Sequence, residues 1–335
     1  MSMPVIKYCP GTLAEGYNTY SPAFLRRMFR GKKVSHILPY DAPQKNEADA
    51  EKFLENRKRI SISGVQEKLS LLLEKNRLRL TLEGEQGGYM LKPIPRDLKK
   101  TDQVPANEHL TMQIASQVYD IYTADNGLIF FKDGTPAYIT RRFDMRQDGG
   151  KRGNEDFATL AGKTKTTGGV NFKYEYSYEE AAALIVKYVP AWRVEIEKFF
   201  TLVVFNYLFS NGDAHLKNFA LLETESGDHF LSPAYDLVNT RIHVDDTDFA
   251  LSGGLLADDF ESAAFKKTHH RGQDDFLEFG RRVGIESNRA QKLIAAFLLK
   301  QEKVEVLIKR SFLNEATKRA YLLDYNSRRN SLTQR

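Results

Sequence analysis

Between residues 61 and 143, hydrophobic and polar positions follow mainly a two-residue period. In residues 68–94 and 127–145 they alternate, and the turn sequences EKNR, EGEQGG and KDG interrupt them. This alternation predicts antiparallel strands joined by hairpins. Residues 106–119 differ, because their apolar positions recur every three or four residues and predict a helix. This part of the chain is therefore expected to form a small antiparallel sheet with one helix.

Beyond Phe143 the helical period dominates, and it predicts helices over residues 177–189, 193–209, 288–312 and 315–326. Residues 149–172 are rich in Gly, Lys and Thr and predict loops. Residues 1–50 are polar, with short amphipathic helices predicted at 21–29 and, running past that segment, at 46–59. The pattern predicts a smaller sheet-plus-helix half and a larger helical half, and a cleft between such halves is a usual place for a ligand.

Composition narrows the class of protein only a little. The chain has 335 residues, and its 41% hydrophobic and 28% charged content is that of an ordinary soluble globular protein. The net charge of +5 permits an anionic ligand but does not require one. A single cysteine, Cys9, excludes an intrachain disulfide, the first residues lack a signal-peptide pattern, and the longest apolar run (residues 199–209) is too short to span a bilayer. These features predict a cytoplasmic protein without a membrane partner.

The most informative short stretch is SNGDAHLKNF, which places Asp213, His215, Lys217 and Asn218 between two apolar segments. A zinc site is disfavoured because there is no H-E-x-x-H pair and no second histidine nearby. Ser/His/Asp hydrolysis is disfavoured because there is no G-x-S-x-G elbow. A structural polar turn stays open. In kinase catalytic loops, an Asp that accepts the proton of the acceptor hydroxyl stands five residues before a metal-binding Asn, which is the spacing from Asp213 to Asn218.

Other parts of a phosphoryl-transfer site follow in the expected order. Lys92, on a predicted strand, suits a lysine that contacts nucleotide phosphates, and Glu108 on the next helix is its candidate partner. Asp236, in SPAYDLVNT, suits a second carboxylate that holds Mg²⁺. A short Gly-containing turn precedes Lys92, and its backbone N–H groups suit a phosphate. Each feature alone is weak, and the ordered set favours a kinase.

The chain resembles the HipA-like serine/threonine kinases, the toxin components of bacterial toxin–antitoxin pairs. The resemblance runs from about Ser61 to the C-terminal helices and rests on SISGVQEKLSLLL, YMLKP, ANEH, YITRRFD, EDFATLAG, NGDAHLKNFAL and SPAYDLVNT. It implies a bilobal, α+β protein-kinase-like fold, with an antiparallel sheet and one helix in the N-lobe and a mainly helical C-lobe. The implied domains are an N-terminal extension packed on the kinase core (1–50), the N-lobe (51–143), the C-lobe (144–325) and a flexible tail (326–335).

The resemblance also implies roles for individual residues. Asp213 would be the catalytic base, with Lys92 as the second catalytic residue. Asn218 and Asp236 would bind Mg²⁺. Ser61 and Ser63 would be autophosphorylation sites. The implied ATP contacts are Ser63, Gly64, Val65, Gln66, Glu67, Lys68, Lys92, Arg141, Arg142, Phe143, His215, Lys217, Asn218, Tyr235 and Asp236.

Two departures from the family pattern matter. Full-length HipA has an additional N-terminal subdomain, and this chain is expected to begin after it, as the shorter HipT-type toxins do. The hinge carries Arg141 where the longer HipA kinase has a Glu, so a backbone contact to adenine is expected there rather than a side-chain contact. The implied partners are an aminoacyl-tRNA synthetase as substrate, a helix-turn-helix antitoxin that would link the protein to DNA only indirectly, and a small HipS-like protein.

Two other functions stay open at this point. The pattern D-x-H-x-x-N also resembles the loop of aminoglycoside and choline phosphotransferases, which predicts a small-molecule kinase, although SISGVQEK and YDLVN disfavour it. The chain would alternatively be a nucleotide-binding scaffold that docks a repressor, which the presence of every catalytic residue type disfavours. Transfer of phosphate to a serine of the chain would separate the first of these from a protein kinase.

Overall fold

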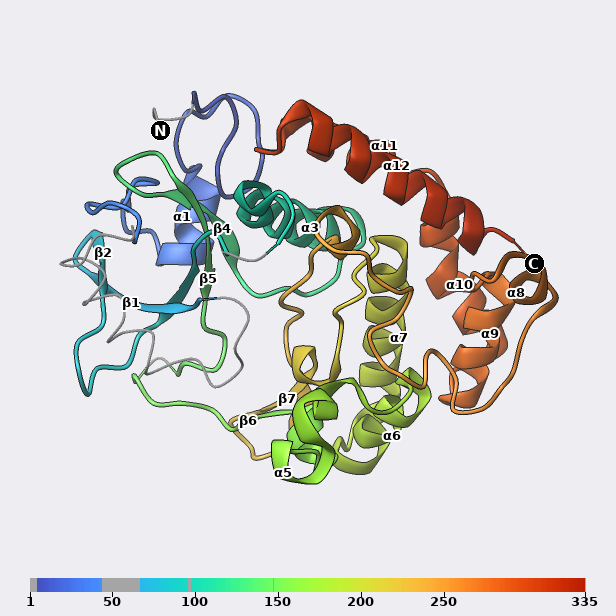
Figure 1. Cartoon of the computed structure of the whole chain (residues 1–335). Coiled ribbons are helices and arrows are strands. Elements are labelled where there is room, and N and C mark those ends of the chain that lie inside the picture. Colours follow the sequence, from blue (N-terminus) through green and yellow to red (C-terminus); the bar gives the residue numbers. More distant parts are fainter. Residues whose placement is uncertain (1–4, 44–66, 96–97, 147, 335) are drawn as a thin grey trace. The chain divides into compact units, whose positions relative to one another are not determined.

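The computed structural model describes residues 5–43, 67–95, 98–146 and 148–334, and they form two compact units (Figure 1). Unit 1 contains the described residues up to Ile114, together with Ala124–Phe143 and Val304–Lys318. Unit 2 contains Ala115–Thr123, Asp144–Lys303 and the described residues from Arg319 onward. The helix predicted over residues 46–59 lies outside the described residues. One division falls between Phe143 and Asp144, where the hydrophobic period also changes.

Unit 1 is built on a five-stranded antiparallel sheet. Its strands are β1 (Leu69–Glu74), β2 (Arg77–Leu80), β3 (Tyr89–Lys92), β4 (Asn126–Phe130) and β5 (Pro136–Arg141), in the order β2-β1-β3-β5-β4. The predicted hairpin sheet is therefore present. The register pairs Leu91 with Ile139 and Lys92 with Tyr138. Because successive side chains of a strand point to opposite faces, Leu91 and Lys92 face opposite sides of this sheet.

Helices α1, α3 and α11 lie wholly or mainly in unit 1. Helix α1 (Pro22–Phe29) begins where the Ser21 hydroxyl accepts the Phe24 N–H, with proline at its first position. It buries Phe24, Met28 and Phe29 in the same core as the inner residues of the sheet. Helix α3 (Val104–Val118) follows a short 3₁₀ turn at Thr101–Gln103 and begins two residues before the predicted start. Helix α11 (Glu302–Arg310) lies almost entirely in this unit.

Unit 2 is mainly helical. Its longer helices are α6 (Tyr178–Tyr188), α7 (Trp192–Leu208), α8 (Ala263–Thr268), α9 (Gln273–Arg282) and α10 (Ser287–Leu298). The region expected to be loops also contains short elements: β6 (Asn154–Asp156), α4 (Phe157–Leu160), α5 (Lys165–Gly168) and the 3₁₀ helix η2 (Gly169–Tyr174). The helical pattern of 288–312 is divided between α10 and α11, because Leu299 is extended and ends α10. Helix α7 is apolar on nearly every face and is correspondingly buried.

A second, three-stranded antiparallel sheet lies in unit 2, in the order β6-β7-β8. Strand β7 (Ala220–Glu223) is central and pairs with β6 on one side and β8 (His229–Leu231) on the other. The Glu195 carboxylate of α7 accepts the Leu231 N–H of β8 at 3.0 Å, and this bond ties the sheet to the buried helix.

The flexible tail predicted at 326–335 is wrong for most of its length, because helix α12 (Glu315–Leu332) continues through it. Its inner face is buried: Tyr325, Arg328 and Leu332 are each at most 2% exposed. The Arg328 guanidinium lies 2.5 Å from Asp248, whose other carboxylate oxygen lies 2.8 Å from the His270 ring. A basic, polar composition resembles a free tail, and this long-range ion pair could not be inferred from it.

Within the described residues, no helix combines the length and apolar character needed to cross a membrane.

The buried end of α12 gives a stability prediction. Arg328→Met keeps a side chain of similar length but leaves the Asp248 carboxylate without its guanidinium. Breaking a buried pair in this way costs about 3–5 kcal/mol. We expect about 3 kcal/mol, because Asp248 is partly exposed and retains His270. Urea unfolding measures the loss. Arg319→Met, at an exposed position of the same helix, is the control, and equal stability of the two variants would contradict the prediction.

Candidate active site

Antiparallel pairing in the small sheet brings Asp156, Asn218 and Asp236 to one end of the sheet. Strand β6 ends at Asp156, which pairs with Ala220, the first residue of β7. Strand β8 ends at Leu231, which pairs with Leu221, and the Ser232 N–H continues the ladder to the Ala220 carbonyl at 2.8 Å. The segment before β7 and the segment after β8 are therefore neighbours. This arrangement explains why Asn218 and Asp236 meet although 18 residues separate them.

The backbone of the loop 210–219 is held at several points. Thr240 is the main anchor: its hydroxyl donates to the Ser210 carbonyl at 3.0 Å and accepts the Gly212 N–H at 2.9 Å. The Tyr178 hydroxyl donates to the Ala214 carbonyl at 2.8 Å. The Asn211 amide donates to the backbone carbonyl of Asp236 at 3.4 Å. These bonds hold the backbone of the loop without using the side chains that were predicted as site residues.

Asp213 lies exposed on this loop and is engaged by a residue that the sequence did not point to. The Tyr174 hydroxyl donates to Asp213 Oδ1 at 2.8 Å. Desolvation by the surrounding protein is the main effect that raises the pKa of Asp213, and the charge of the nearby Asp236 carboxylate also raises it. The hydrogen bond from Tyr174 and the charge of Lys173 oppose this rise. A carboxylate whose pKa lies closer to neutral pH is better suited to accept a proton.

His215 is buried and serves the loop through its backbone. Its N–H donates to the Asn218 Oδ1 at 3.1 Å, and its carbonyl accepts the Asn218 N–H at 2.8 Å. Burial, followed by the charge of Lys173, lowers the pKa of His215 to about 3. The ring is therefore neutral at pH 7 and brings no positive charge to a phosphate. Its role as an ATP contact stays a prediction, and it would be limited to a neutral hydrogen bond.

Asn218, Asp236 and Lys217 lie at the same end of the small sheet. The Asn218 Nδ2 is 3.5 Å from Asp236 Oδ2. Asp236 has a left-handed backbone with φ of 57°, a conformation that Asp tolerates better than most residues. The Lys217 ammonium lies 3.6 Å from the Asp156 carboxylate, and the Tyr235 hydroxyl donates to the Lys217 carbonyl at 2.8 Å. Lys217 is thus engaged by a carboxylate in this structure.

The donor chemistry of this pair fits Mg²⁺. An amide and a carboxylate oxygen are hard ligands, and Mg²⁺ in nucleotide sites takes one or two protein oxygens together with phosphates and water. No cluster of three or more His, Cys, Asp or Glu side chains suited to a metal occurs in the part of the chain that the structure describes. Asn218 and Asp236 are the residues that would hold a magnesium ion brought by a nucleotide, and this role stays a prediction.

In unit 1, Lys92 and Glu108 form a buried ion pair. Lys92 is on β3 and Glu108 on α3, and the Lys92 Nζ lies 2.6 Å from Glu108 Oε1 with both side chains less than 5% exposed. The ammonium also lies 5.3 Å from the centre of the Tyr138 ring. A buried pair with this geometry holds the ammonium in one place, as a phosphate-binding lysine requires. The catalytic role of the pair stays a prediction.

The remaining predicted contacts are less informative. Arg141 ends β5, and its guanidinium contacts Asp125 at 3.6 Å and donates to the Arg27 carbonyl at 3.1 Å, so the side chain is engaged within unit 1. The Arg142 N–H donates to the Gly88 carbonyl at 2.9 Å, and Phe143 follows in a turn. Glu67 and Lys68 immediately precede β1. The predicted loop residues Ser61, Ser63, Gly64, Val65 and Gln66 lie outside the described residues.

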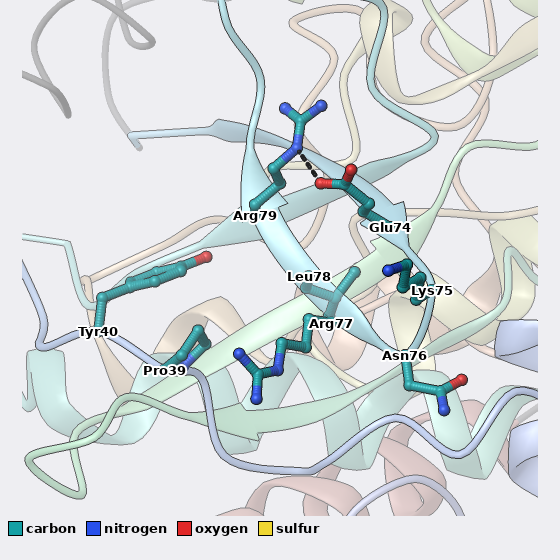
Figure 2. A pocket seen from close by; sticks show the side chains of 8 residues that line it. All are labelled: Pro39, Tyr40, Glu74, Lys75, Asn76, Arg77, Leu78 and Arg79. Atoms are coloured by element: carbon teal, nitrogen blue, oxygen red, sulfur yellow. Dashed lines mark hydrogen bonds and ion pairs between the residues drawn. The ribbon is translucent and has the colours of Figure 1, made fainter.

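A surface pocket of about 560 Å³ lies elsewhere in unit 1, at the β1–β2 hairpin (Figure 2). Arg79 lines it, and its guanidinium is bound by Glu74 at 2.9 Å, as Figure 2 shows, and by Glu85 at 2.6 Å, so its charge is already balanced. The lining residues are Pro39, Tyr40, Glu74, Lys75, Asn76, Arg77, Leu78 and Arg79, and none of them is a predicted site residue. We therefore do not assign this pocket to the nucleotide.

Three contributors to the site were absent from the sequence prediction. Asp156 stood in the motif EDFATLAG without an assigned role, although an Asp before a helix is a recognisable N-cap signal, and it does cap α4. Thr240 and Tyr174 gave no signal in the sequence, because their contacts are distant along the chain. Thr240 lies 28 residues from its partner Gly212, and Tyr174 lies 39 residues from its partner Asp213.

The buried pair of unit 1 gives a second stability prediction. Glu108→Leu removes the carboxylate next to the buried Lys92, and we expect a loss of about 3–5 kcal/mol in urea unfolding. The double variant Lys92→Met with Glu108→Leu replaces the pair by apolar groups and should recover most of this loss. Equal losses in the single and the double variant would show that packing rather than charge accounts for the effect.

The neutral state of His215 gives a pH prediction. Because its folded pKa of about 3 is below the unfolded value, the folded state binds fewer protons below about pH 6.5. The stabilisation is complete above that pH and decreases by about 1.4 kcal/mol per unit as the pH falls toward 3. The carbon–proton NMR signal of the His215 ring should not titrate between pH 8 and 5, with the exposed His229 as reference. A midpoint above pH 5 would refute it.

Sequence comparison relates the chain to known proteins. The model of the family "HipA-like C-terminal domain" matches residues 60–304. A Haemophilus influenzae protein named "Putative kinase" is 27% identical over 329 residues, which cover 94% of this chain and 92% of that protein. Y4dM of Sinorhizobium fredii, named in the same way, is 28% identical over 226 residues, which cover 63% of this chain and only 52% of that protein.

Two solved structures share the fold. HipA from the toxin–antitoxin system of Shewanella oneidensis MR-1, solved with HipB and operator DNA, has a TM-score of 0.62 and 20% identity; the match covers 82% of this chain and 65% of that chain. The Helicobacter pylori proinflammatory kinase CtkA has a TM-score of 0.51 and 15% identity, over 79% of this chain and 93% of that one. These matches confirm the predicted α+β, kinase-like fold. Because the family model covers most of the chain, the protein belongs to the HipA-like C-terminal domain family.

Proposed function

We propose that this protein is an ATP- and Mg²⁺-dependent protein serine/threonine kinase and the toxin of a HipA/HipT-type toxin–antitoxin system. The observation that carries the proposal is the loop of unit 2, in which one anchored turn presents Asp213 and brings Asn218 within 3.5 Å of Asp236. Membership of the HipA-like family and the kinase names of its relatives support it.

Each residue has a role that follows from its chemistry. Asp213 accepts the proton of the acceptor hydroxyl. At the same time the hydroxyl oxygen attacks the γ-phosphorus of ATP, and the bond between that phosphorus and the leaving ADP breaks. Lys92, held by Glu108, places a positive charge on the phosphates. Asn218 and Asp236 hold Mg²⁺, which neutralises charge on the β- and γ-phosphates. Catalysis of this type depends mainly on positioning and electrostatics, which suits a loop with several backbone anchors.

The finer parts of the proposal concern acceptors and partners. Ser61 and Ser63 precede β1 and are proposed as autophosphorylation sites, where added negative charge would oppose ATP phosphates. By family analogy, the protein substrate is an aminoacyl-tRNA synthetase, and the antitoxin partners are a helix-turn-helix repressor and a small HipS-like protein. The HipA relative was solved with HipB and operator DNA, which supports a repressor partner. Contact with DNA is proposed to be indirect, through that partner.

Labelled ATP tests the proposed reaction. The full chain with MgATP should transfer label to Ser61 or Ser63, located by mass spectrometry. Asp213→Asn should reduce transfer by about 10²–10⁴-fold, because it removes the proton acceptor without changing the size of the side chain. Asp246→Asn is the matched control and should retain most of the activity, since it removes an equal charge close to the loop at Gly212.

The results separate the alternatives. Label found only on an amino sugar or choline would refute a protein kinase and favour a small-molecule kinase. Unchanged transfer in Asp213→Asn would refute the assignment of the base. If the chain binds ATP but transfers no label under any condition, the proposal is refuted in favour of a nucleotide-binding scaffold that docks a repressor.

A further inference from the structure

The hydroxyl of Tyr174 makes the contact with Asp213 that an acceptor is expected to make. An acceptor hydroxyl must donate a hydrogen bond to the base at about 2.6–3.2 Å between heavy atoms. Tyr174 donates to Asp213 Oδ1 at 2.8 Å. The donor group, the direction of donation and the distance all agree with that requirement.

We propose that Tyr174 occupies the acceptor-hydroxyl subsite of Asp213, so that an incoming serine or threonine hydroxyl must displace it. This inference rests on the proposed function, because it takes Asp213 as the base. It adds a residue that limits access to the base and marks the position of the acceptor side chain in unit 2.

The contact belongs to a segment that is fastened at Tyr174 and at the residues that follow it. The Tyr174 carbonyl accepts the Ser252 N–H at 2.7 Å, and the Tyr176 carbonyl accepts the Gly253 N–H at 2.9 Å. Four residues after Tyr174, Tyr178 donates its hydroxyl to the carbonyl of Ala214, next to the base. The phenol is thereby directed at Asp213 by its backbone, so the hydrogen bond is not an accident of a free surface side chain.

The ring also packs against the loop that it occupies. It meets the buried His215 ring edge-on, with 5.2 Å between centroids and an angle of 72° between planes. The Lys173 ammonium lies 4.8 Å from the centre of the Tyr174 ring. The aromatic ring is therefore held beside the loop that carries Asp213.

The same contact is nevertheless displaceable. Tyr174 is only partly buried and Asp213 is exposed, so a competing hydroxyl approaches without unfolding of the segment. Occupation of the subsite by the chain itself lowers the apparent affinity for every acceptor by the fraction of time for which the subsite is free. A tightly recognised protein substrate overcomes this competition, whereas water and small alcohols compete poorly.

Tyr174→Phe tests the proposal because it removes the hydroxyl and keeps the ring. The assay follows ADP formation by the full chain with MgATP, first with water as acceptor and then with increasing N-acetylserinamide. We expect ATP hydrolysis to increase about 3–10-fold and the half-saturating concentration of N-acetylserinamide to decrease by a similar factor, with kcat changed less than about twofold. Where the small acceptor is not used, hydrolysis alone decides the outcome.

Two neighbouring tyrosines provide matched controls. Tyr176→Phe removes a hydroxyl from the same segment, away from the hydrogen bond to Asp213, and should behave like the wild type. Tyr178→Phe removes an anchor of the loop and should lower the rate or the melting temperature without improving use of the acceptor. Melting curves establish that each variant is folded.

The results divide clearly. A lower kcat of Tyr174→Phe with an unchanged half-saturating concentration would show that Tyr174 only positions Asp213, and the proposal would be overturned. Rates identical to those of the wild type would overturn it as well. If the wild type forms no ADP beyond the level of Asp213→Asn, the proposed kinase function itself has failed, which is recognisable because every variant then matches Asp213→Asn.

Discussion

The pairing of β7 with β6 and β8 is the constraint on which the candidate site depends. Side chains that are distant in sequence converge because β7 begins where its two neighbours end. A slip of one residue would turn each side chain to the other face of the sheet, so the register of these short strands determines whether Asn218 and Asp236 meet. The hydrogen bond from Leu231 to Glu195 ties this register to helix α7, which also leads into the loop.

The two units handle charge in different ways. Unit 1 buries the Lys92 ammonium and compensates it with Glu108, an arrangement whose value lies in fixing a charge rather than in stability alone. In unit 2 the Asp213 carboxylate is exposed and accepts a hydrogen bond from the neutral Tyr174 hydroxyl. The lysine of the first unit is therefore fixed by an opposite charge, whereas this aspartate is held by a neutral group.

Sequence patterns predicted what local rules determine. Hairpin turns and apolar alternation gave the sheet of unit 1, and the interval between Asp213 and Asn218 is fixed by the turn that contains both. They could not predict contacts that depend on tertiary packing. Tyr174 reaches Asp213 across 39 residues. Arg328 looked like part of a basic tail until its burial beside Asp248 was known, because no local pattern records an ion pair across 80 residues.

Helix α12 has a consequence for how the protein is made. It begins in unit 1, where residues to Lys318 belong, and it ends in unit 2 at Leu332. During synthesis, domains generally fold as units in the order in which they emerge. Here neither unit has all of its contacts until helix α12 has been translated, because each contains a different part of it. A ribosome-bound chain that stops before Glu315 would therefore leave both units incomplete.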